Sequence, residues 1–183
     1  IVSSGIPQEK VVKEISNLMV SNGFNEIMNN SLTKKEYYDG LEQVKEEDHV
    51  ELLNPLSQEL NILRRNLLFG GLETIARNNN MKNPNLKLFE FGKTYFKNAQ
   101  GEYQEQKHLS ILITGSKGEN TWNTDSSEVS FYTLKGYVST ILDRLGIPKL
   151  KMKSLQNEFL SDGIGVYFKK TMIAEYGKVK AKF

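Results

Sequence analysis

The order of the apolar segments constrains this fold more than any other feature of the sequence. Strand candidates follow one another across short polar turns and do not alternate one by one with helices. They span residues 86–91, 94–96, 109–114, 150–155, 164–169 and 172–176, and the polar stretch 99–106 is expected to be a long hairpin connection. Consecutive strands joined in this way pair antiparallel, whereas parallel strands need long crossovers. The sequence therefore predicts an α+β fold in which an antiparallel β-sheet is flanked by helices.

Three segments have helical spacing of their apolar residues. Residues 8–22 form the first amphipathic helix, which Gly23 ends. Residues 134–145 form a second strong amphipathic pattern. Between them, residues 60–75 have mixed spacings around the pair Gly70–Gly71, which predicts two short helical pieces joined at the glycines.

Composition limits the class of protein. The chain has 183 residues, of which 38% are hydrophobic and 25% charged, and no apolar run approaches the ~18 residues of a membrane span. A single domain over residues 1–183 and no membrane partner are expected. The chain starts at Ile1 without an initiator Met and ends at Phe183 inside an alternating apolar pattern, so we expect a piece excised from a longer polypeptide.

Charge and motifs exclude several kinds of active site. The net charge of +2 neither requires nor excludes a nucleic-acid partner, and the absence of cysteine removes thiolate chemistry. Phosphate-binding loops and the common hydrolase and metalloprotease signatures are missing. The isolated histidines His49 and His108 are expected to be structural. For the adjacent pair Arg64–Arg65, a structural role is favoured over phosphate binding.

Several short segments together resemble one family, the bacterial phenylalanyl-tRNA synthetase beta subunit. They occur in the family's order and run from Ser4 to about Gly146, and the last strands are only loosely similar. The matching segments are residues 4–7 (SGIP), 23–27 (GFNEI), 53–57 (LNPLS), Leu63–Arg64 with Leu67–Leu68, 88–93 (LFEFGK), Gly115, Trp122 and 131–136 (FYTLKG). The resemblance implies a class II aminoacyl-tRNA synthetase-like fold, in which this chain is the catalytic-like module.

The resemblance also implies a subunit interface in the first part of the chain. In class II folds the first motif is a long helix followed by Gly, an aromatic residue and a strand that ends in Pro. Residues 8–32 look like this motif, although Asn30 stands where the Pro is expected. The candidate interface residues are Val11, Ile15, Leu18, Met19 and Phe24.

The same comparison implies that the module is catalytically silent. Active class II enzymes have an Arg in the second motif that binds ATP phosphates and the amino-acid carboxylate, and Phe96 stands at the corresponding place. A phenyl ring has neither charge nor hydrogen-bond donor for a developing phosphate charge. The third motif, which is glycine-rich and ends in Arg, is absent from the chain. We expect no catalytic, metal-binding or cofactor-binding residue here.

The resemblance also implies the enzyme complex to which such a module belongs. The alpha subunit would charge tRNA(Phe) with phenylalanine, using ATP and Mg²⁺, in a cytoplasmic heterotetramer of two alpha and two beta chains. This module would be its scaffold and interface. Editing and anticodon recognition would lie outside the chain.

Two other interpretations remain open at this point. In the first, the chain is an active class II ligase-like, ATP-binding domain in which Arg64, Glu90 or Glu105 contacts ATP and magnesium. In the second, it is an RNA-binding domain that uses the lysines alternating along residues 149–153 and 178–182. Protection of a sheet edge against aggregation explains those lysines as readily.

Overall fold

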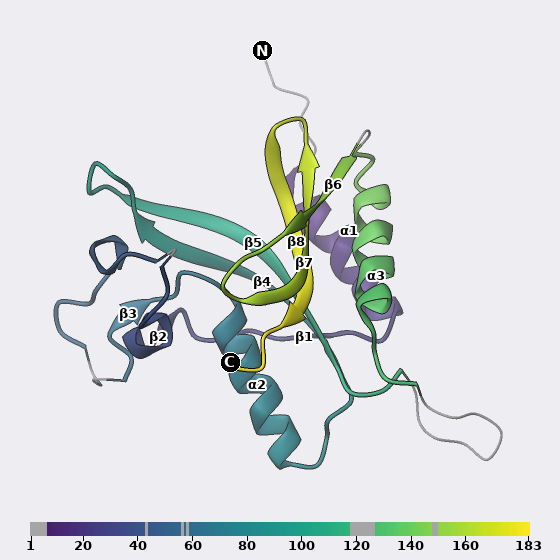
Figure 1. The fold of residues 1–183 in the computed structure, drawn as a ribbon, viewed down its shortest axis with the longest axis horizontal. Coiled ribbons are helices and arrows are strands. Elements are labelled where there is room, and N and C mark those ends of the chain that lie inside the picture. Colours follow the sequence, from purple (N-terminus) through teal and green to yellow (C-terminus); the bar gives the residue numbers. More distant parts are fainter. Residues whose placement is uncertain (1–6, 43, 56, 58, 118–126, 148–149) are drawn as a thin grey trace. The chain divides into compact units, whose positions relative to one another are not determined.

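The computed structural model describes residues 7–42, 44–55, 57, 59–117, 127–147 and 150–183 (Figure 1). Residues 4–6, Leu56 and Trp122 of the matching segments and Lys149 of the alternating lysines lie outside them. The chain divides into two compact units: residues 23–114, and residues 1–22 together with 115–183. Each unit is described by itself, and a single domain over residues 1–183 stays a prediction.

The first unit, residues 23–114, is built on a three-stranded sheet with the order β1-β4-β5. β4 pairs antiparallel with β5, and β1 pairs parallel with β4. A separate antiparallel pair joins β2 to β3. The elements are β1 (Asn25–Glu26), β2 (Leu32–Thr33), η1 (Lys35–Tyr38), η2 (Glu46–Asp48), β3 (Ile62–Leu63), α2 (Leu68–Asn80), β4 (Leu86–Lys97) and β5 (Tyr103–Thr114).

Helix α2 packs closely on this sheet through apolar side chains and a glycine. Leu86, Leu88 and Leu112 form a buried cluster against which Leu68 and Ile75 of the helix pack. A Cβ atom on Gly71 would lie 2.7 Å from a methyl carbon of Leu112. Glycine at this position therefore lets the helix backbone approach the sheet closely.

The second unit contains the antiparallel sheet β6-β7-β8 and two helices. Leu142 of α3 is buried with Val166 and Tyr176 of the sheet. The two helices are linked by an ion pair in which Arg144 Nη2 lies 2.7 Å from Glu14 Oε2. The elements are α1 (Gln8–Ser21), α3 (Phe131–Arg144), β6 (Leu150–Leu155), β7 (Leu160–Phe168) and β8 (Thr171–Val179).

The predicted α+β class is confirmed, and two local predictions are wrong. Residues 86–97 form one continuous strand, and the stretch 99–106, expected to be a connection, begins pairing at Tyr103. The distal part of this hairpin, residues 103–108, is exposed, so its strand lacks the apolar alternation on which the prediction relied. Residues 60–75 hold one helix, α2, that starts at Leu68 and continues through Gly70–Gly71.

No helix among the described residues is long and apolar enough to cross a membrane.

Candidate functional site

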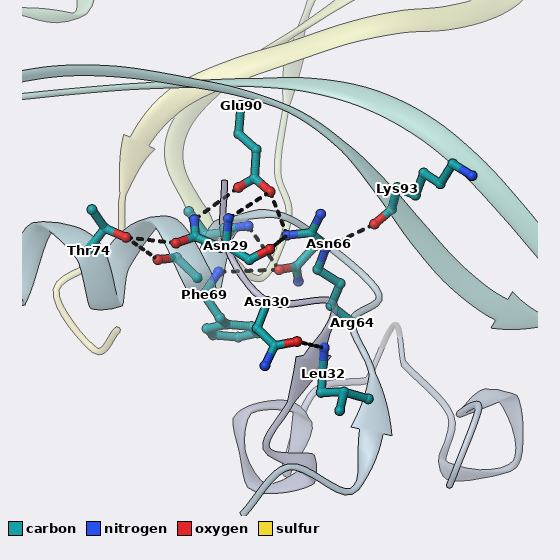
Figure 2. A network of polar contacts seen from close by, with 11 residues as sticks. Asn29, Asn30, Leu32, Arg64, Asn66, Phe69, Thr74, Glu90 and Lys93 are labelled. Atoms are coloured by element: carbon teal, nitrogen blue, oxygen red, sulfur yellow. Dashed lines mark hydrogen bonds and ion pairs between the residues drawn. The ribbon is translucent and has the colours of Figure 1, made fainter. Parts of the chain in front are cut away.

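A buried ion pair lies at the centre of the first unit (Figure 2). Arg64 Nη1 donates to Glu90 Oε1 at 2.6 Å, and the two residues are only 7% and 1% exposed. Arg64 follows β3, and Glu90 lies in β4 among apolar neighbours. Arg64 Nε also donates to the carbonyl oxygen of Lys93 at 2.9 Å. The ion pair therefore ties β3 to β4 in the interior of the unit.

Asn29 and Thr74 extend this pair into a network. The Asn29 side-chain amide donates to Glu90 Oε2 at 2.9 Å, and Asn29 Oδ1 accepts a hydrogen bond of 2.9 Å from the Thr74 hydroxyl. Thr74 lies in α2, so the network joins the segment after β1 to the helix and the sheet (Figure 2). Both carboxylate oxygens of Glu90 have partners, which offsets the cost of burying the charge.

Glycine at position 92 makes room for the arginine. A Cβ atom on Gly92 would lie 2.5 Å from Arg64 Nη2 and 2.7 Å from Leu67 Cδ2. Any side chain at this point of β4 would displace the guanidinium. Gly92 belongs to the segment 88–93 that resembles the family, and the packing of Arg64 against it explains why a glycine stands there.

The residues considered for ATP and magnesium are engaged within the chain. Arg64 and Glu90 bind each other in the interior. Glu105 Oε1 lies 2.8 Å from Lys93 Nζ in a half-exposed ion pair. Among the described residues, no group of three or more histidine, cysteine, aspartate or glutamate side chains is placed to hold a metal ion. The contacts of Arg64 and Glu90 are therefore those of structural residues.

Phe96, at the place of the missing motif arginine, lies on β4 opposite Gln104. The guanidinium of Arg65 lies over its ring, 5.9 Å from the centroid. Arg65 Nη1 also donates to the carbonyl oxygen of Asp48 at 2.9 Å, and the Arg65 side chain is only 15% exposed. The arginine nearest to this position is thus held by protein groups.

Asn30, where the motif proline is expected, has a local role. Its Oδ1 accepts a hydrogen bond of 3.0 Å from the backbone N–H of Leu32 (Figure 2). Such an Asx turn shapes the chain between β1 and β2 without proline.

The candidate interface residues differ in burial. Ile15, Met19 and Phe24 are 1–3% exposed within the chain itself, so packing inside the chain accounts for them without a partner. Val11 and Leu18 are half-buried. The assignment of all five residues to a subunit interface stays a prediction.

The two histidines lie in different surroundings. His49 is buried, its ring centroid lies 5.3 Å from that of Tyr38, and its Nδ1 has no hydrogen-bond partner within the described part of the chain. Burial, helped by the positive charge of Arg65, lowers the pKa of His49. His108 lies on the more exposed β5, where partial burial of the ring also lowers its pKa. Among the residues that the structure describes, neither histidine is part of a metal-binding group.

Comparison with known proteins identifies the family. The family model described as "Phenylalanyl tRNA synthetase beta chain CLM domain" matches residues 2–183. The chain belongs to this family. Phenylalanine–tRNA ligase beta subunits from Bacteroides thetaiotaomicron and Bacteroides fragilis are 42% and 45% identical over 94% and 85% of the chain. The one from Thermotoga maritima is 33% identical over 74% of it.

The chain spans about a fifth of the length of these relatives, from 17% to 22%. It thus corresponds to one module of a much longer subunit.

A solved structure supports the fold class. A pyrrolysyl-tRNA synthetase from Desulfitobacterium hafniense, PylSc, superposes on 95% of this chain with a TM-score of 0.66, at 15% sequence identity and over 59% of its own length. This similarity confirms the class II synthetase-like fold predicted for the CLM domain.

Sequence reasoning found Arg64 and Glu90 but missed Asn29 and Thr74. A signal for the network exists in β4, where a glutamate stands in the run Leu88–Phe91 of otherwise apolar residues. A carboxylate in a buried strand needs a cation or several donors. Its partners Arg64 and Asn29 come from two other segments of the chain, and their meeting depends on the tertiary fold.

We predict that Glu90→Ala lowers the free energy of unfolding by about 3–5 kcal/mol, because it leaves the Arg64 charge buried without its partner. The double variant Arg64→Met with Glu90→Gln loses less, since it leaves no buried charge. Urea unfolding of the purified chain measures both. As a control, Glu105→Ala breaks the half-exposed pair with Lys93 and costs less than about 1 kcal/mol. A Glu90→Ala cost no larger than that of the control would contradict the assigned role of the ion pair.

We predict that His49 makes the protein less stable in mild acid. The unfolded chain takes up a proton near pH 6.5, whereas the folded chain takes it up only below that value because burial lowers the pKa of His49. The free energy of unfolding therefore falls as pH falls from about 6.5 to the lowered pKa. His49→Phe keeps a ring beside Tyr38 and flattens the profile in this window. Unfolding at a series of pH values tests this, with His108→Gln in both proteins so that the lowered pKa of His108 does not contribute, and equal slopes with and without His49→Phe would sink the prediction.

Proposed function

We propose that the chain is a non-catalytic scaffold module of a phenylalanine–tRNA ligase beta subunit. In this proposal the alpha subunit charges tRNA(Phe) with phenylalanine, using ATP and Mg²⁺, in the cytoplasm during translation. The observation that carries the proposal is the enclosed Arg64–Glu90 pair in a chain of the CLM-domain family. A charge pair that holds the fold together is unavailable to a substrate.

The chemistry of amino-acid activation supports this assignment. Adenylation develops negative charge on phosphate, and an active site must aim preorganised cations or donors at it. In residues 23–114, Arg64 is buried against Glu90, and Arg65 is held by Asp48 and the Phe96 ring. Phe96 itself has no charge. The geometry therefore favours a module that supports the active site of another subunit over one that has an active site of its own. In the ligase-like interpretation, Arg64 and Glu90 would have to bind ATP or Mg²⁺, but they already bind each other.

Assembly follows from the same proposal. The module would pack within a heterotetramer of two alpha and two beta chains, and the first helix would contribute to a contact with the alpha subunit or the second beta copy. Ile15 and Met19 are buried in the chain and stabilise the helix, while Val11 and Leu18 are half-buried beside them. Apolar groups that keep exposed surface can bury more of it against a partner.

The test of catalytic silence is a calorimetric titration of ATP, Mg²⁺ and phenylalanine. We expect no saturable binding to the intact beta subunit alone, and saturable binding once the alpha subunit is added. Glu105→Gln in the beta subunit leaves the charging rate unchanged, because Glu105 only pairs with Lys93. Saturable binding by the beta subunit alone, abolished by changes in residues 23–114, would show that an active site exists here.

The helix α1 contact is tested by the double variant Val11→Asp with Leu18→Asp. It places two charges at the edge of the apolar face, so we expect weaker co-elution of the beta subunit with the alpha subunit while the melting temperature stays close to that of wild type. Asn17→Asp, on the exposed side of the same helix, is the matched control and leaves co-elution intact. Co-elution at wild-type level in the double variant would remove this face from the interface.

A further inference from the structure

An asparagine followed by glycine stands at the end of helix α1. In such a dipeptide the backbone nitrogen of the glycine can reach the side-chain carbonyl carbon of the residue before it, because glycine has no side chain to obstruct the approach. The same spacing occurs where glycine follows aspartate. The chain contains three dipeptides of these two kinds, which are Asn22–Gly23, Asp39–Gly40 and Asp162–Gly163.

Asn22 is the reactive residue of the three near neutral pH. An aspartate is ionised there, and a carboxylate repels a nucleophile, whereas the asparagine amide is neutral and can release ammonia. Asp162 is restrained as well, because Gly163 is buried opposite Leu155 and a Cβ atom on it would lie 2.7 Å from the Leu155 carbonyl oxygen. Gly23 is exposed with a φ of +80°, and in the described part of the chain only its sequence neighbours lie within 4 Å of a Cβ built on it.

Asn22 caps the last turn of α1. Its backbone N–H donates to the carbonyl oxygen of Met19 at 3.0 Å, and its side-chain amide donates to that of Leu18 at 2.8 Å. With ψ at 13°, the nitrogen of Gly23 lies on the side of the Asn22 backbone nitrogen and away from the side chain. Attack therefore requires this turn to open, and the ends of helices open at little cost because few contacts hold them.

We propose that Asn22 is a site of spontaneous deamidation. The backbone nitrogen of Gly23 loses its proton to water and attacks Cγ of Asn22, so an N–Cγ bond forms and the amide nitrogen leaves as ammonia with a proton from the solvent. Water then adds to either carbonyl of the cyclic succinimide. The ring opens to aspartate or to isoaspartate, in which the backbone runs through the side chain. Water is consumed and ammonia is released, and no oxidant or enzyme is required.

Both products weaken the end of α1. The new carboxylate stands at the negative end of the helix dipole, beside the Leu18 carbonyl oxygen, which loses the hydrogen bond that the amide donated. Isoaspartate also lengthens the backbone between α1 and β1 by a methylene group. Met19, whose carbonyl oxygen accepts from the Asn22 N–H, is buried. Opening of this turn therefore reaches a residue of the core.

The test follows the intact protein that contains this chain, purified with its partner subunits, during incubation in mildly alkaline buffer. Trypsin releases the peptide of residues 14–34, in which the internal controls are Asn17, Asn25, Asn29 and Asn30. Each control is followed by a residue that has a side chain. Tandem mass spectrometry locates every amide that has become an acid, and a sample digested at once gives the background.

We expect progressive loss of the Asn22 amide, faster at higher pH, while the control asparagines keep theirs. Isoaspartate should appear in the same peptide and be methylated by a protein isoaspartyl methyltransferase. Asn22→Gln is the matched variant, since its longer side chain would have to close a larger ring, and it should give no methylation. The proposal is overturned if Asn22 loses its amide no faster than Asn17 and Asn25. It is overturned too if aspartate forms without isoaspartate, because direct hydrolysis gives aspartate alone.

Asn22→Asp reproduces one product and tests the effect on the helix. We expect amide hydrogen exchange in the last turn of α1 to become about two- to fivefold faster, because a charge at the unfavourable end of a helix raises the population of the open turn. Asn17→Asp adds the same charge at an exposed position inside the helix and leaves the exchange rate unchanged. Equal rates in the two variants would overturn the assigned effect. None of these measurements depends on the scaffold role, which is tested by co-elution and ATP titration.

Discussion

The first unit depends on one ion pair that water barely reaches. Arg64 follows β3 and Glu90 lies in β4, and the groups that complete their hydrogen bonds come from the segment after β1 and from the backbone of β4. Thr74 brings the helix into the same network. Because a buried charge without its partners is costly, these segments can settle in only one register relative to one another. The polar network thus specifies how these segments pack inside an apolar core.

Glycines make room for neighbouring side chains in both units. In the first unit, Gly71 and Gly92 are places where a Cβ atom would strike a side chain, so they permit tight packing of helix on sheet and of arginine on strand. In the second unit, a Cβ atom on Gly165 would lie 2.9 Å from Cε2 at the edge of the Tyr167 ring. In each case the absence of a side chain on the glycine lets a larger side chain lie against the backbone.

The sequence predicted the helices and strands that have a periodic apolar pattern. It failed for the features that depend on tertiary contacts. The α+β class, the helix near residues 134–145 and the three last strands follow from local patterns and were predicted. The predicted connection 99–106 includes residues 103–106 of the strand β5, because an exposed hairpin has no apolar face to reveal it. Gly70–Gly71 suggested a break in a helix, yet the close approach of Gly71 to Leu112 and of Gly70 to Asn29 explains why glycines stand inside this helix. Of the polar network, Glu90 was visible as a charge in an apolar strand, whereas Asn29 and Thr74 are brought to it only by the folded chain.

The contact between Arg65 and Phe96 limits which side chains position 96 accepts. An arginine at position 96 would bring a second guanidinium toward the one that now covers the ring, and like charges at this range repel. Arg65 already binds the backbone oxygen of Asp48 and lies beside the Asp48 carboxylate. The surroundings of position 96 therefore favour an uncharged ring over a second cation.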